Sequence, residues 1–349
     1  MPGTFLNYPF DEELFLMNWQ AAADPTRTAM VESGAVQRNR EIERLIASGS
    51  NAYSIPFYNV LGGTADNYDG TSNINVTAPT GGAQTGVVYG RAHAWKDQDF
   101  VRDFGNGANP MIQISQQVAK YWQKNRQTRL LGMLKALFDI TDDNTDNWDA
   151  WQLHTLNLAL AASGTVTDAN RISDASAADA MQKAVGDNAG IFSMAFMHSS
   201  IANRLAKLQL LSYRKYTDPM GIERRLPIAD WNGLTVIVDD GAPKGTSVTT
   251  SETEYTTYLL GAGAIQFGNA PVDTPVEIGR DRLAGGGYNY LVTRFRETYH
   301  PNGFSFTIPT SGSAKVISPT DAQLGTAGNW SLAGIDAKNI AIARIITNG

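Results

Sequence analysis

The residue types that carry most enzyme chemistry are scattered through this chain. The four histidines, His93, His154, His198 and His300, stand singly, without the helical spacing that lets two of them share a metal ion. His198 precedes Ser199 at the end of an expected strand, where adjacent side chains point to opposite faces and are not oriented for proton transfer. The chain has no cysteine, which excludes thiolate metal sites, cysteine nucleophiles and disulfides. These residues predict no catalytic site.

An acidic stretch from residue 142 imitates the start of a calcium-binding loop. Asp142, Asn144 and Asp146 have the spacing of the first ligands. However, Asn147 stands where the loop needs a glycine, and Leu153 stands where a bidentate glutamate should close the site. We interpret the stretch as a solvated turn that caps the next helix, with a cation site as the weaker alternative.

A glycine-rich stretch at 261–264 raises the question of a nucleotide site. It lacks the third glycine of the dinucleotide fingerprint, and it lies in an apolar, strand-like run. The chain also has no Gly-Lys-Ser/Thr phosphate loop. Nearby carboxylates such as Glu252 and Glu254 are too common in sequences to indicate glycoside hydrolysis. We therefore predict no enzymatic activity, no cofactor and no metal.

One segment, from Pro110 to Phe138, has an unusual distribution of charge. The range has no Asp or Glu in a chain of net charge -6, and it carries the cations Lys120, Lys124, Arg126, Arg129 and Lys135. At about 100° per residue, Lys120, Lys124 and Lys135 fall on one polar face of a helix, opposite an apolar face. Two interpretations remain open: an ordinary amphipathic helix with solvated lysines, or a helix whose basic face contacts nucleic-acid phosphates without sequence specificity.

Composition limits the class of protein that positions this helix. The chain has 349 residues, of which 42% are hydrophobic and 18% are charged, which predicts a folded protein whose surface is largely covered by neighbours. Its net negative charge argues against a dedicated nucleic-acid binder. The N-terminus leads into Asp11, Glu12 and Glu13 without a signal peptide, and no apolar run approaches the roughly 20 residues of a membrane helix. We expect a cytoplasmic product that does not enter a membrane.

The first half of the chain divides into segments of different amino-acid composition. An arm with an apolar cluster at residues 14–19 is followed by a short amphipathic helix around Ile42 and Ile46. Residues 51–90 are rich in Gly, Thr and Asn, and only Asp66 and Asp69 carry charge there, which predicts a long hairpin that lies on another surface. A helix begins at residues 109–110 and reaches residue 138, a length of roughly 40 Å.

The second half mixes helices and strands. Helices are expected at 151–162, 177–185, 201–211 and after residue 319. Strands are expected at 191–197, 234–238, 255–265, 288–296, 304–308 and 340–346, separated by Asp, Gly and Pro turns.

Short motifs recur in a fixed order along these segments: Ile55-Pro56-Phe57, Gly107 to Pro110, Ala195 to Ser199, Trp231 to Leu234, Val238 to Asp240, Tyr258 to Gly261, Gly263 to Ile265, Arg280-Asp281 and the corner from His300 to Phe304. In this order, the segments and motifs resemble the major capsid proteins of tailed bacteriophages, whose Hong Kong 97-like fold is also used by encapsulins. Each match is short, and their joint order over nearly the whole chain carries the resemblance.

The resemblance implies an α+β fold and a particular division of the chain. The parts would be an N-terminal arm at 1–30, a peripheral P-domain at 31–50, 91–140 and 273–310 with a long spine helix at 109–138, an E-loop at 51–90, an axial A-domain at 141–272 and a C-terminal segment at 311–349. Subunits would form hexamers and pentamers of an icosahedral head shell around double-stranded DNA. The virion would be assembled in the cytoplasm of a bacterial host.

The resemblance also implies partners for the chain. These are further copies of itself, a separate scaffolding protein, a portal, a decoration protein, and packaged DNA contacted by Lys120, Lys124 and Lys135. A separate scaffold is expected because barely 50 residues precede the hairpin. Relatives that crosslink their shells use an E-loop lysine, and residues 51–90 contain none, so we expect no Lys-Asn isopeptide bonds. The alternatives are an encapsulin shell and, from another class, a β-rich hydrolase with an unrecognised carboxylate pair.

Overall fold

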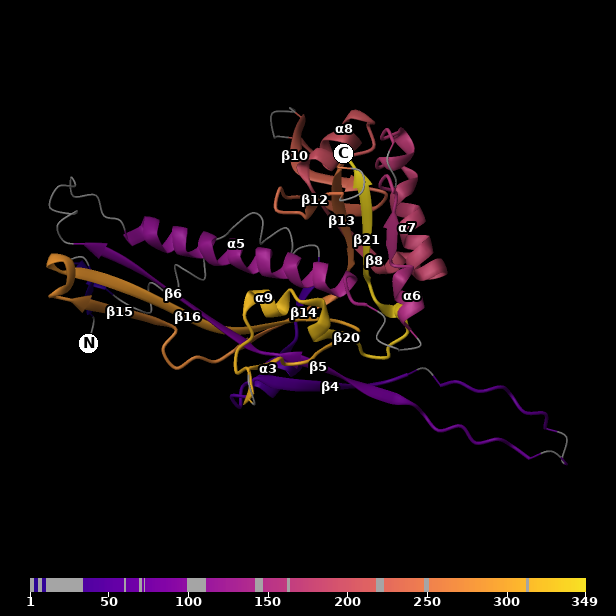
Figure 1. Ribbon diagram of the computed structural model, residues 1–349, viewed down its shortest axis with the longest axis horizontal. Helices are drawn as coiled ribbons and strands as arrows, with labels where there is room; N and C mark the ends of the chain where they lie inside the picture. Colours follow the sequence, from indigo (N-terminus) through magenta and orange to yellow (C-terminus); the bar gives the residue numbers. More distant parts are fainter. Residues whose placement is uncertain are drawn as a thin grey trace.

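A computed structural model of the chain mixes helices with two large sheets and a projecting hairpin (Figure 1). It describes residues 3–5, 8–10, 34–59, 61–68, 71, 73–98, 111–141, 147–161, 164–217, 223–247, 251–311 and 314–349. Most of the expected arm, the helix start at 107–110 and the calcium-like turn at 142–146 lie outside these residues. The predicted α+β class is confirmed.

A five-stranded sheet forms the longer body of the molecule. Its strands are β3 (Val36–Arg38), β6 (Tyr89–Gln98), β14 (Ile265–Ala270), β15 (Val276–Asp281) and β16 (Tyr288–Pro301). The order is β15-β16-β14-β3, and β6 pairs with the other side of β16. Side chains alternate along the first part of β16, so that Asn289, Leu291 and Thr293 are buried on one face while the even-numbered residues from Tyr288 to Arg296 are half-exposed on the other.

The long helix α5 (Met111–Phe138) covers the buried face of this sheet (Figure 1). Its Trp122 donates from Nε1 to Thr293 Oγ1 on β16 over 3.0 Å. Met133, Leu134 and Leu137 join the largest hydrophobic core. With 28 residues the helix is about 42 Å long, as the sequence predicted.

An eight-stranded mixed sheet forms the second body. Its strands are β7 (Thr155–Asn157), β8 (Phe192–Met197), β9 (Ser212–Thr217), β10 (Glu223–Trp231), β11 (Leu234–Val238), β12 (Lys244–Thr246), β13 (Thr253–Gly261) and β21 (Ile342–Asn348). The order is β7-β21-β13-β8-β11-β10-β9, with β12 beside β13. Helices α7 (Ala175–Val185) and α8 (Ser199–Lys207) share a core with one face of the sheet, and the other face joins the core under α5. Burial on both faces explains the nearly continuous apolar sequence of β8.

Smaller elements complete the two bodies. Helices are α3 (Arg40–Ile46), α6 (Trp148–Gln152) and α9 (Asp321–Leu324), and strands are β1 (Gly3–Phe5), β2 (Tyr8–Phe10), β4 (Ala52–Tyr58), β5 (Gly81–Val87), β17 (Phe304–Phe306), β18 (Thr310–Ser311), β19 (Ala314–Lys315) and β20 (Trp330–Leu332). Short 3-10 helices lie at Asp168–Asn170, Gly186–Ile191, Ala284–Gly286, Ala327–Asn329 and Ala337–Asn339. Among the described helices, none combines the length and the apolar character that crossing a membrane requires.

Three expected elements differ in the structure. The helix expected at 151–162 is wrong, because α6 ends at Gln152 and the next residues form β7, which pairs in parallel with β21 from the far end of the chain. The apolar run at 255–265 is divided, since the chain turns at Gly263, with a φ of 68°, and passes from one sheet to the other. Helix α8 ends at Lys207, short of residue 211, because Gln209 adopts a left-handed φ of 58°.

Candidate assembly surface and basic helix face

The predicted hairpin is present and projects from the rest of the molecule (Figure 1). Strands β4 and β5 pair from Ala52 with Val87 to Tyr58 with Gly81. Beyond this pairing, nearly all described residues of the tip are exposed. The large hydrophobic residues there are exposed by 69% or more: Tyr58, Leu61, Tyr68, Ile74 and Val76. A cluster of exposed hydrophobic side chains of this kind marks an interaction surface.

The base of the hairpin is fastened to β16 and to the corner that follows it. Gln84 Oε1 accepts hydrogen bonds from His300 Nε2 over 3.0 Å and from Gly303 N over 2.9 Å. Tyr53 Oη lies 2.9 Å from Thr298 Oγ1. Burial lowers the pKa of His300 to about 4, so the imidazole is neutral at pH 7 and donates only from Nε2 to this amide. The hairpin therefore projects from a well-packed root.

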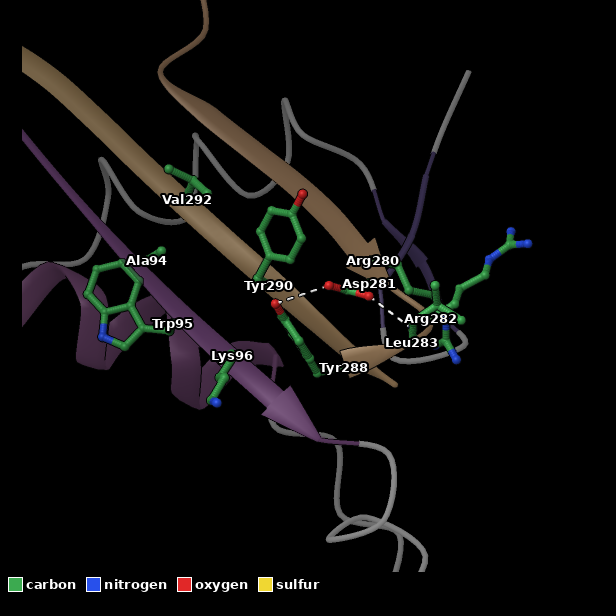
Figure 2. Close-up of a pocket in the computed structure, with 10 residues that line it drawn as sticks. All are labelled: Ala94, Trp95, Lys96, Arg280, Asp281, Arg282, Leu283, Tyr288, Tyr290 and Val292. Atoms are coloured by element: carbon green, nitrogen blue, oxygen red, sulfur yellow. Dashed lines mark hydrogen bonds between the residues drawn. The ribbon is translucent and has the colours of Figure 1, made fainter. Parts of the chain in front are cut away.

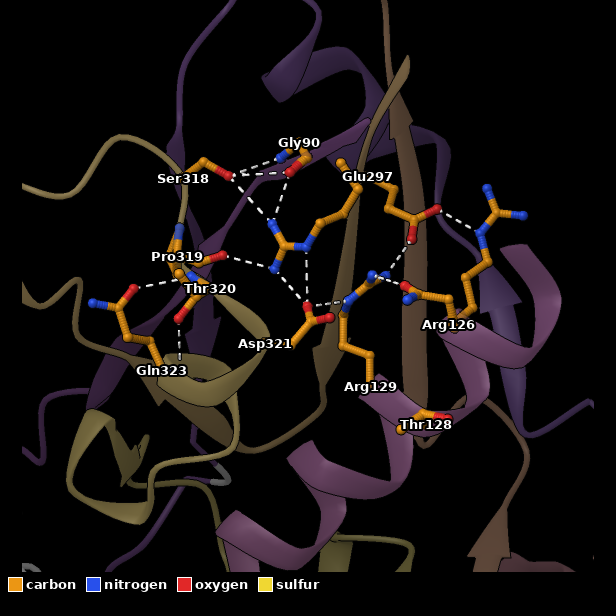
Figure 3. A network of polar contacts seen from close by, with 12 residues as sticks. Gly90, Arg126, Thr128, Arg129, Glu297, Ser318, Pro319, Thr320, Asp321 and Gln323 are labelled. Carbon is orange, nitrogen blue, oxygen red and sulfur yellow. Dashed lines mark hydrogen bonds and ion pairs between the residues drawn. The ribbon is translucent and has the colours of Figure 1, made fainter. Parts of the chain in front are cut away.

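A buried ionic network holds α5 against the sheet (Figure 3). Glu297 on β16 is fully buried and accepts from Arg126 Nε over 2.8 Å and from Arg129 Nη1 over 3.0 Å. Arg129 also donates from Nε to Asp321 Oδ1 over 2.7 Å, and Arg91 donates to the same oxygen over 2.6 Å. The network thus joins α5, β6, β16 and α9, and each of its carboxylates contacts two arginines.

The pKa values of the two carboxylates are shifted in opposite directions. Burial raises the pKa of Glu297, while the charges of Arg126 and Arg129 work against that rise. Burial would also raise the pKa of Asp321, but hydrogen bonds from Arg129 and Arg91 outweigh it and leave this pKa below its usual value. Because the guanidinium groups stay charged, the buried carboxylate is needed to compensate them.

The basic face of α5 is smaller than its sequence indicates. Lys120, Lys124 and Lys135 are exposed, as the helical spacing predicted. Arg126 and Arg129 instead turn into the ionic network, and Lys135 forms an ion pair with Asp139 one turn later. Among the described residues, Lys120 and Lys124 have no carboxylate at ion-pair distance. These two lysines are the main positive charges that the helix offers to a partner.

The histidines lie in different parts of the fold. His198 caps α8 by accepting from Ser200 N over 3.1 Å, and its Nε2 is 3.8 Å from Asp240. His154 is buried, with Nδ1 2.8 Å from Ile342 O, and His93 stacks on Tyr121 of α5. In the described part of the chain, no three His, Asp or Glu residues gather closely enough to hold a metal ion.

The two carboxylates of the ionic network, Glu297 and Asp321, were not predicted from the sequence. One signal was present for Glu297, because Thr293 and Glu297 share the buried face of one strand, where a carboxylate needs a cationic partner. The helix predicted at 109–138 contains no Asp or Glu, and its Arg126 and Arg129 were candidate cationic partners for this carboxylate. No comparable signal marks Asp321, which reaches Arg129 from a short helix 192 residues further along the chain.

Comparisons with known proteins agree with this architecture. No model of a protein family matches the chain. The major capsid protein of Bacillus phage SPP1 is 28% identical over 321 residues, which cover 91% of this chain and 90% of that protein. The chain is thus similar to a phage major capsid protein over nearly its whole length. The resemblance inferred from its sequence is thereby confirmed.

Two solved structures share the fold. The capsid of Ralstonia phage GP4 aligns with a TM-score of 0.53 and 10% identity, covering 92% of this chain and 88% of that one. The Cyanophage Pam1 capsid asymmetric unit aligns with a TM-score of 0.52 and 9% identity, covering 93% of each chain. The predicted Hong Kong 97-like fold is confirmed. In this Hong Kong 97-like chain, the tip of the projecting hairpin and Lys120 and Lys124 of α5 are exposed.

Proposed function

We propose that the chain is the subunit of an icosahedral phage head, in which hexamers and pentamers enclose double-stranded DNA in the virion. The observation that carries the proposal is the hairpin tip, whose large hydrophobic side chains are exposed in a single subunit. Such a surface is stabilised when another copy covers it, which a closed shell provides. Similarity to a major capsid protein over nine-tenths of both chains supports the same role. The role is structural, not enzymatic.

Each part of the subunit would have its own role in the assembled shell. Residues 51–90 act as the E-loop that lies on a neighbouring copy, and the five-stranded sheet with α5 forms the P-domain. Residues 141–272, apart from β14 in the five-stranded sheet, supply the axial A-domain, whose copies meet around five-fold and six-fold axes. The C-terminal segment at 311–349 contributes to both bodies, since β20 pairs with β17 and β21 lies inside the eight-stranded sheet. A separate scaffolding protein, a portal and a decoration protein would complete the head.

Assembly of the purified protein tests this function. Sedimentation and negative-stain microscopy are expected to reveal closed shells, hexamers or pentamers. Compact monomers with hydrolytic turnover would instead favour the hydrolase. Particles from infected cells are expected to contain DNA, whereas enclosed protein cargo would favour an encapsulin.

Denaturing electrophoresis of mature particles should give a single band at the size of one chain. The reason is that residues 51–90 offer no lysine for an isopeptide bond. Ladders of covalently joined chains would contradict this expectation.

The exposed lysines of α5 would contact the packaged DNA without sequence specificity. In the double variant Lys120→Gln/Lys124→Gln, we expect the slope of log affinity for duplex DNA against log salt concentration to fall by about 2, one for each lost phosphate contact. Binding of a short duplex to unassembled subunits, titrated at several salt concentrations, measures this slope. The matched control is Lys207→Gln/Lys244→Gln, two exposed lysines of the other body. An equal change in both variants would contradict a specific inner face on α5.

A further inference from the structure

Strand β6 forms an open edge of the five-stranded sheet. It pairs with β16 in a regular antiparallel ladder over all ten of its residues, and no other described strand pairs with its second side. In Figure 2, Ala94 and Lys96 lie on β6 beside β16, at the margin of an open groove. Backbone N–H and C=O groups along such an edge can pair with a strand of another chain.

Two hydrogen bonds show which backbone groups of β6 point to the open edge. Gly90 N donates to Ser318 Oγ over 3.0 Å, away from β16. Arg294 N, which lies opposite Ala92 in the ladder, donates over 2.8 Å to a carbonyl just before β15, away from β6. The pairs of Gly90 and Ala92 with β16 are therefore non-hydrogen-bonded, and the pattern repeats at every second residue. The residues whose N–H and C=O groups point to the open edge beyond Gly90 are Ala92, Ala94 and Lys96.

This part of the edge lacks the usual protection against strand pairing. Its three outward-facing residues are exposed, and within the described part of the chain their backbone groups have no partner on this side. Edge strands that resist pairing carry bulges, prolines or several charges. Residues 92–96 have a regular register, no proline and a single lysine. The edge is therefore suited to accept another strand.

Aromatic side chains extend the open edge on the face that α5 covers. The rings of His93 and Trp95 lie 5.0 Å and 5.4 Å from the Tyr121 ring, measured between centroids. His93 is exposed, and Tyr121 is 39% exposed. Exposed aromatic side chains beside unpaired backbone groups are typical of a surface that another protein covers.

A second copy of the same strand fits this edge. In an antiparallel pair centred on Ala94, this residue lies opposite itself, and Ala92 lies opposite Lys96 of the partner subunit. The outward N–H groups of each strand then reach the outward C=O groups of the other. His93 lies opposite Trp95 of the partner subunit, and no like charges face each other directly. The edge is thus complementary to itself.

Antiparallel pairing of two identical strands requires a twofold axis perpendicular to the sheet. Such an axis places both copies of α5 on the same side of the joined sheet, so that Lys120 and Lys124 of both subunits face the same side of the wall. We propose that the β6 strands of two subunits pair about Ala94 and join their sheets across a local twofold axis of the shell. This inference rests on the proposed head-shell function.

Disulfide trapping tests the register of this pairing, because the chain has no cysteine. In shells of the Ala94→Cys variant, mild oxidation is expected to give a covalent dimer on non-reducing electrophoresis, since the two opposite Cα atoms would be about 5.5 Å apart. The matched control is Ala92→Cys, whose two copies would be roughly 13 Å apart and should not react. Shells that mix Ala92→Cys subunits with Lys96→Cys subunits should again give the dimer.

Removal of one backbone donor supplies a second readout. Ala94→Pro deletes an N–H group that points away from β16, so the ladder within the subunit is retained. The protein concentration needed for assembly should rise about tenfold or more, because each strand pair loses two hydrogen bonds. Ala94→Thr keeps the N–H group and should assemble at the wild-type concentration. Circular dichroism and urea unfolding check that both variants are folded.

Three results would overturn the proposal: Ala94→Cys shells without a covalent dimer, equal trapping in the Ala92→Cys control, and wild-type assembly of Ala94→Pro. Sedimentation under reducing conditions scores shell formation separately. Shells that form without the dimer would refute the strand pairing alone, whereas wild-type subunits that never form shells would refute the head-shell function itself.

Discussion

Replacing Glu297 by alanine is expected to lower the free energy of unfolding of the subunit by about 3 to 5 kcal/mol. The change leaves Arg129 buried without its direct counter-charge on β16, and it removes the partner of Arg126. A buried guanidinium cannot neutralise itself by losing a proton, and Asp321, which is shared with Arg91, compensates the charge of Arg129 only in part. Urea unfolding of unassembled subunits, followed by tryptophan fluorescence, measures the loss.

A matched control lies on the neighbouring strand. Glu277 of β15 pairs with Arg294 over 2.7 Å, but both side chains are substantially exposed. Glu277→Ala should therefore cost no more than about 1 kcal/mol. Glu297→Gln retains one acceptor oxygen but loses the charge and the second acceptor, so its cost should fall between those of the two alanine variants. Equal costs at Glu297 and Glu277 would show that the buried network does not hold α5 in place.

Removing hydrophobic side chains of the hairpin tip is expected to weaken shell formation strongly while leaving the subunit folded. In the variant Leu61→Ser/Val76→Ser, the concentration needed for assembly should rise about 100-fold or more. Burying two such side chains on a neighbour contributes about 3 to 6 kcal/mol, and every 1.4 kcal/mol corresponds to a tenfold change. Sedimentation over a range of protein concentrations gives this threshold.

The subunit's own stability should hardly change in this variant. Leu61 and Val76 are 76% and 96% exposed, so their removal costs little packing within one chain. Ile317→Ser alters a similarly exposed residue outside the hairpin and is expected to leave assembly near the wild-type threshold. Wild-type assembly by the hairpin variant would contradict the role of the tip in contacts between subunits.

Elements with strong local patterns were predictable. Strand β11 was expected at 234–238 and occupies Leu234–Val238, and α7 and α5 begin within two residues of their expected positions. These segments combine regular apolar spacing with clear turn or cap residues, which local physical chemistry recognises. The hairpin at 51–90 was equally visible because its residues lack charge and favour strands and turns.

Elements that depend on distant partners were not predictable. Strand β6 was not expected, because its sequence from Tyr89 to Gln98 lacks regular apolar alternation; its ladder with β16 joins residues about 200 positions apart. Strand β7 replaced an expected helix for the same reason, since it pairs with β21 near the C-terminus. Tertiary pairing outweighs local propensity in such segments.

The charges of α5 separate what the sequence determined from what the tertiary structure decided. Helical periodicity alone placed Lys120, Lys124 and Lys135 on one exposed face, because the angle between successive residues is a local property of the helix. Only the folded chain decided that Arg126 and Arg129 point inward. Their partner Glu297 is brought beneath the helix by the register of β16 in its sheet, and a register set by long-range pairing cannot be read from the helix sequence.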